Sequence, residues 1–81
     1  MKNFIEEQVK DLEWNRDYHE KKLETVTWQF EAVTQNPHAK NNSESVKDLQ
    51  RQVIYNTERL TYYTLMLSVF YTARDLTTET V

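Results

Sequence analysis

The chain has 81 residues, with 10 basic and 13 acidic side chains, a net charge of −3, no cysteine and no glycine. This length allows one small domain, the lack of cysteine excludes disulfides and zinc-thiolate sites, and the negative charge disfavours a general phosphate-binding surface. Because glycine is absent and Pro37 is the single proline, the composition predicts long helices with one break.

The first predicted helix covers about residues 3–36, with Asn3 as its N-terminal cap. Apolar residues recur along it in alternating steps of three and four, as one face of a heptad repeat requires. They are Ile5, Val9, Leu12, Leu23, Val26, Phe30 and Val33. The two steps missing from this series fall on Arg16 and His19. The pattern predicts an apolar seam with polar residues in its middle.

Pro37 disfavours helical geometry at Asn36, so the first helix is expected to end there and a loop to cover 37–42. The second predicted helix covers about 43–76, followed by a frayed tail at 77–81. The heptad spacing returns in this second helix. Its seam positions are Val46, Leu49, Val53, Asn56, Leu60, Tyr63, Leu67, Phe70 and Arg74.

A loop of this length joins antiparallel neighbours. Folding the chain there pairs seam residues whose numbers sum to about 79, for example His19 with Leu60. The polar seam residues Arg16, His19, Asn56 and Tyr63 then meet in one layer, which penalises slipped pairings. The sequence therefore predicts an all-α fold: one antiparallel, coiled-coil-like two-helix hairpin over residues 1–81.

A second set of apolar and aromatic residues lies about 160° from the seam on both helices. Its members are Phe4, Trp14, Tyr18, Trp28, Tyr55, Tyr62, Leu65 and Val69. A helical hairpin cannot cover these side chains by itself, and large exposed apolar patches mark interfaces. We interpret them as partner-binding residues, used first in a homodimer that forms a four-helix bundle, with an unidentified second protein as the other possible partner.

The sequence carries no catalytic, cofactor-binding or metal-binding motif. His19 has the titration range of an acid–base catalyst, but a seam histidine more often completes a polar layer. The segment from His19 begins like a zinc-protease helix, yet Leu23 stands where the second histidine is needed. Basic and acidic residues interleave, which argues against DNA binding. The uncharged stretch 60–73 is shorter than the roughly 20 residues of a membrane span.

These features predict a cytoplasmic, non-enzymatic protein-interaction module that acts as an inhibitor, adaptor or regulator of another protein. A structural or assembly subunit of a larger helical complex is the alternative. In helix number and heptad spacing the predicted hairpin also resembles the two-helix subunit of ROP-type bundles. That resemblance implies an RNA-binding four-helix bundle as a third possibility.

Overall fold

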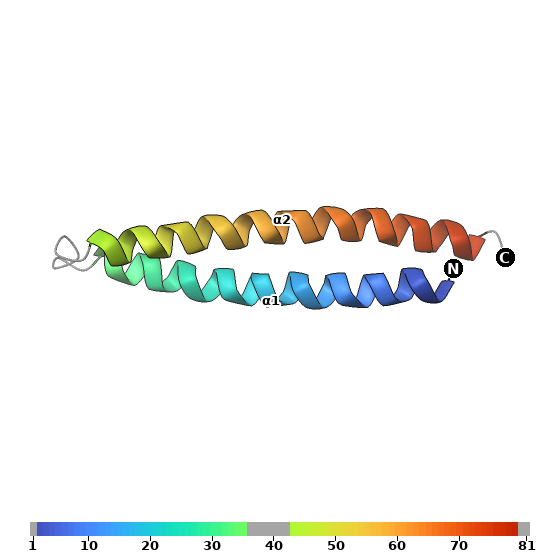
Figure 1. The fold of residues 1–81 in the computed structure, drawn as a ribbon, viewed down its shortest axis with the longest axis horizontal. Coiled ribbons are helices and arrows are strands. Elements are labelled where there is room, and N and C mark those ends of the chain that lie inside the picture. The colour runs from blue at the N-terminus through green and yellow to red at the C-terminus, as the bar shows by residue number, and fades with distance from the viewer. Residues whose placement is uncertain (1, 36–42, 80–81) are drawn as a thin grey trace.

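The computed structural model describes residues 2–35 and 43–79, which form two α-helices, α1 (Lys2–Gln35) and α2 (Ser43–Glu79). The helices lie side by side and antiparallel, so the start of α1 and the end of α2 share one end of the molecule (Figure 1). The Cα atoms span 62 × 15 × 14 Å. The predicted hairpin is confirmed, while its loop at 37–42 lies outside the described residues.

The predicted seam holds the two helices together. Val9, Leu12, Val26 and Leu67 are buried, and the remaining apolar seam residues from Ile5 to Phe70 are half-buried. Val9, Leu12 and Leu67 form the central apolar cluster, and half-buried hydrophobic side chains surround it. Each turn of α1 therefore presents a narrow apolar stripe to the matching stripe of α2, because residues three and four apart share a helix face.

The register of the two helices agrees with the predicted pairing. The His19 ring bonds to Asn56 and stacks on Tyr63, which lie on either side of Leu60 in the seam of α2. His19 is therefore centred near Leu60, as a residue-number sum of about 79 requires. Three of the polar seam residues, His19, Asn56 and Tyr63, meet at mid-length, although their contacts are diagonal and not directly opposite, whereas Arg16 contacts Asp17.

Three details of the described helices differ from the expectations of the sequence. Asn3 lies inside α1, because the helix begins at Lys2, and does not cap it. The predicted frayed tail is helical as far as Glu79. Within this last stretch the Thr77 side chain is half-buried, and its hydroxyl donates to the Ala73 carbonyl at 2.8 Å. Arg74 does not enter the seam; it is exposed, with its guanidinium 5.0 Å from the Tyr71 ring centre.

Candidate interaction surface

A buried polar pair lies at the middle of the seam. His19 and Asn56 are only 7% and 4% exposed, and His19 Nδ1 lies 2.8 Å from Asn56 Oδ1. Asn56 Nδ2 donates to the Gln52 carbonyl at 2.8 Å, which fixes the orientation of the amide. Since Oδ1 only accepts, His19 Nδ1 carries the hydrogen and donates it. The His19 ring is therefore engaged in a hydrogen bond that links the two helices.

Aromatic rings surround His19 on both helices. Tyr18 and Tyr55 approach it edge-on, with ring centres at 5.0 and 6.0 Å, and Tyr63 stacks on it at 5.6 Å. Trp14 in turn stacks on Tyr18 at 5.8 Å. The ring contacts therefore continue from the outer side of α1, through the buried layer, to α2.

The two arginines near this layer make different contacts from those the sequence suggested. Arg16, predicted to join the polar layer, is half-buried and directs its Nε and Nη2 to Asp17 Oδ1, both at 3.1 Å. Arg59, which the sequence analysis did not single out, donates to the Tyr63 hydroxyl at 2.7 Å. It also lies over the Tyr62 and Tyr63 rings, at 5.4 and 5.0 Å. These cation–π contacts fix Arg59 on the aromatic residues of α2.

Tyr71 joins the two helices near the open end of the hairpin. Its hydroxyl donates to Glu13 Oε2 at 2.7 Å, a contact between residues 58 positions apart that the sequence analysis missed. Glu13 and Tyr71 each follow directly after a seam residue, and this shared position is the signal that could have revealed the pair. The hydrogen bond to Glu13, and then burial, raise the pKa of Tyr71, outweighing the opposite effect of Arg16.

This raised pKa predicts a loss of stability at alkaline pH. The folded state holds the phenol proton more tightly than the unfolded chain, so the contribution of Tyr71 is full below about pH 10 and falls as pH rises through the folded-state value. We expect the unfolding free energy of Tyr71→Phe to be about 1 kcal/mol lower than that of the unmodified chain at pH 8, with the gap closing above pH 10. Urea unfolding at both pH values measures this gap, and a constant gap would contradict the assignment.

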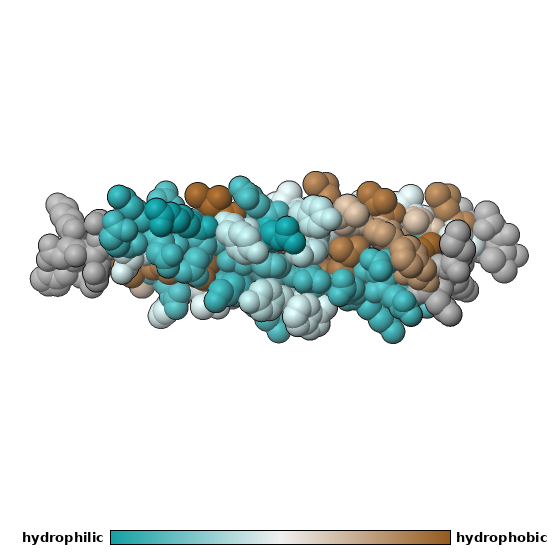
Figure 2. All heavy atoms as spheres, in the orientation of Figure 1, coloured by the Kyte–Doolittle hydropathy of each residue, from teal (hydrophilic) through white to brown (hydrophobic). Residues whose placement is uncertain are grey.

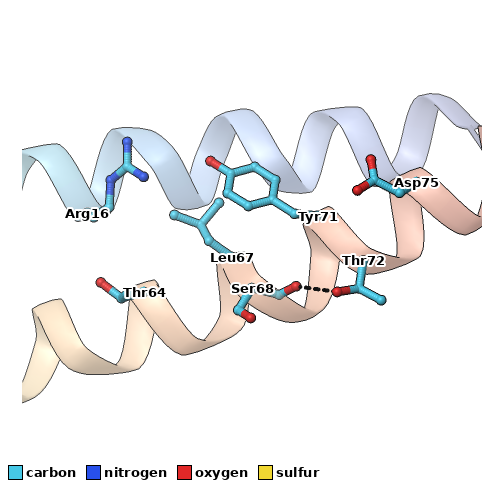
Figure 3. A pocket seen from close by; sticks show the side chains of 7 residues that line it. All are labelled: Arg16, Thr64, Leu67, Ser68, Tyr71, Thr72 and Asp75. Carbon is cyan, nitrogen blue, oxygen red and sulfur yellow. Dashed lines mark hydrogen bonds between the residues drawn. The ribbon is translucent and has the colours of Figure 1, made fainter.

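A groove of about 380 Å³ runs beside Tyr71. Figure 3 shows Arg16 on α1 and the Tyr71 ring, from α2, lying between the two helices. Thr64, Leu67, Ser68, Thr72 and Asp75 complete its lining. The Thr72 hydroxyl is bonded to the Ser68 carbonyl at 3.0 Å, and no histidine lines the groove.

The eight residues predicted to bind a partner are all exposed. Exposed fractions run from 48% for Tyr62 to 70% for Trp28. Hydrophobic residues gather along α2 in the half of the hairpin that carries the chain ends, shown in brown in Figure 2, whereas the loop half is mainly hydrophilic. Ile54 and Leu76 are exposed as well, at 51% and 58%. The hairpin thus leaves large apolar side chains uncovered on both helices.

Within residues 2–35 and 43–79 there is no cluster of three or more metal-ligating side chains, and neither helix combines the length and the hydropathy of a membrane span. The described site is therefore a surface of rings, aliphatic side chains and arginines that lie over rings, among them Arg59 and Arg74. No protein-family model matches the chain, and no curated protein or solved structure is significantly similar to it.

Proposed function

We propose that the chain is a non-enzymatic protein-interaction module, a hairpin that self-associates into a four-helix bundle and acts on another protein as an inhibitor, adaptor or regulator. One observation carries this proposal: the hairpin exposes 66% of Trp14 and 70% of Trp28, two heptads apart on α1. Tryptophan is among the residues most enriched at binding hot spots. Leaving its apolar surface in water is unfavourable in free energy, and burial against a partner would remove that penalty.

The polar chemistry of the hairpin also favours binding over catalysis. His19 is the one histidine among the described residues, and it is buried and bonded to Asn56. A general base has to reach the proton that it removes, which a buried seam residue does not do. The exposed side chains of the middle region are instead aromatic, and aromatic side chains give large contact areas at a low entropic cost.

A site-specific photo-crosslink tests the proposed function. Thr25 lines the same surface hollow as Trp28, so a photoreactive amino acid at position 25 reports what covers that tryptophan. In extract from the cells that make the chain, we expect adducts with one defined protein. Trp28→Ala should reduce these adducts at least ~10-fold, since a hot-spot truncation costs about 2 kcal/mol or more.

The control is Thr57→Ala, which shortens an exposed side chain on α2. It should leave the adducts unchanged. Adducts that are insensitive to both changes would show that Trp28 is not a recognition residue and would count against the proposed function.

A further inference from the structure

The two broad flanks of the hairpin differ in composition. In an α-helix, the residue before a seam position and the residue after it turn about 100° to opposite sides. The two-fold axis that relates antiparallel helices is perpendicular to the plane that contains them, so residues preceding seam positions on α1 and on α2 share one flank. We call this the aromatic flank. The residues that follow seam positions form the opposite, acidic flank.

The exposed apolar side chains gather on one of these flanks. The half-buried Thr77, three residues after Arg74, continues the spacing of the seam by one step. With this step included, six of the ten large exposed hydrophobic residues among those described precede a seam position, and one, Ile54, follows one. The six are Phe4, Tyr18, Tyr55, Tyr62, Val69 and Leu76. The other three, Trp14, Trp28 and Leu65, lie two residues from the nearest seam position and so point outward along the edges. The aromatic flank receives these six side chains from both helices.

The two flanks also differ in net charge. The acidic flank carries seven carboxylates and two lysines, so two copies of it would repel each other. These residues are Glu6, Glu13, Asp17, Glu20, Glu24, Glu31 and Asp75, with Lys10 and Lys47. On the aromatic flank, Asp11 and Asp48 are balanced by Lys22 and Arg59. Its net charge is zero, and two copies of it can approach without net repulsion.

The hairpin exposes more surface than a compact monomer of its mass. Its accessible surface is 6376 Å², whereas a compact monomer of 9.8 kDa exposes about 5200 Å². The excess of about 1200 Å² is larger than the roughly 800 Å² that each partner hides in a standard interface. Self-association through one flank would therefore remove most of the excess exposure.

We infer that a second copy of this chain docks on the aromatic flank, so that the dimer buries Tyr18, Tyr55, Tyr62 and Val69 while Trp14 and Trp28 stay at the outer edges. This inference rests on the proposed function and adds to it the flank that is used. The acidic flank, with the groove beside Tyr71, faces outward in the dimer.

A matched pair of charge insertions tests the choice of flank. Val69 and Ile54 are both aliphatic, are 61% and 51% exposed, and lie on opposite flanks of α2. In sedimentation equilibrium, Val69→Glu should raise the dimer dissociation constant at least ~10-fold, because each dimer would bury two uncompensated carboxylates. Ile54→Glu should change it less than ~3-fold, since this flank stays in water. Circular dichroism checks that both variants keep their helices.

Cysteine labelling gives a second test that needs no charged substitution. The chain has no native cysteine, so Val69→Cys and Ile54→Cys each provide one thiol. The maleimide reaction of Val69→Cys should slow as the protein concentration rises, while that of Ile54→Cys should not. If the unmodified chain dimerises and both flanks respond alike, the flank inference is wrong and the proposed self-association stands. If the unmodified chain stays monomeric, both are wrong.

Discussion

Leu67→Ala is expected to lower the unfolding free energy by about 2–4 kcal/mol. Leu67 is 2% exposed and packs with Val9 and Leu12 in the central apolar cluster. Removing its branched end leaves a cavity between two helices that meet along one narrow stripe, so neighbouring side chains have few routes to refill it. A domain of this size is stable by about 4–12 kcal/mol in total. The substitution therefore removes a large share of the stability.

Leu65→Ala is the matched control for this change. Leu65 is the same residue type two positions earlier, but it is 63% exposed at the outer edge of α2. Urea unfolding at low, fixed protein concentration should show a change within about 0.5 kcal/mol for Leu65→Ala. Equal losses from the two substitutions would contradict the assignment of Leu67 to the core.

Asn56→Leu is expected to destabilise the hairpin by about 1–3 kcal/mol, although it adds apolar surface at a buried position. The reason is the partner: His19 Nδ1 donates to Asn56 Oδ1 at 2.8 Å, and the substitution leaves that donor buried without an acceptor. Replacing both residues, as His19→Leu with Asn56→Leu, removes the donor as well. The double variant should recover the original stability or exceed it.

The three variants and the unmodified chain form a double-mutant cycle that isolates the coupling of the pair. We expect a coupling free energy above about 1 kcal/mol from urea unfolding monitored by helical circular dichroism. The recovered stability has a cost in specificity, because a buried polar layer holds the register. Additive effects of the two single substitutions would mean that the histidine and the asparagine do not depend on each other.

The heptad spacing alone determines most of this fold. Val9, Leu12, Val26 and Leu67 are buried where the periodicity places them, because an antiparallel pair of helices buries one stripe from each. Spacing also brings His19 to mid-length, but it does not choose between Asn56 and Leu60 as its partner. Hydrogen bonding makes that choice, because the buried His19 ring needs an acceptor, which Asn56 Oδ1 supplies at 2.8 Å and the Leu60 side chain does not.

Contacts that depend on side-chain reach were not predicted from periodicity. Arg74 occupies a seam step in the sequence, yet its guanidinium lies over the Tyr71 ring and the side chain remains exposed. Taking a guanidinium out of water is costly, and the long side chain can keep its charged end at the surface. Tyr71 and Arg59 were missed for the related reason that neither is a seam residue, although both have long side chains that reach into or across the interface.

The residues proposed for partner binding are exposed, as predicted, and antiparallel packing adds a division among them that the sequence analysis did not make. The sequence analysis placed all eight opposite the seam, as one set. Antiparallel packing divides them: Trp14, Trp28 and Leu65 lie along the edges, while Tyr18, Tyr55, Tyr62, Val69 and Phe4 share the aromatic flank. This division depends on the two helices being antiparallel neighbours, so it cannot be inferred from the periodicity of either helix alone.

Self-association is the central claim, and sedimentation equilibrium of the unmodified chain tests it most directly. Between about 1 and 500 µM, the range in which a modest interface dissociates, we expect the mass to rise from the 9.8 kDa of one chain to twice that value and then to level off. A plateau at the dimer supports a closed four-helix bundle. A mass that stays at one chain throughout, or that keeps growing beyond two, would contradict it.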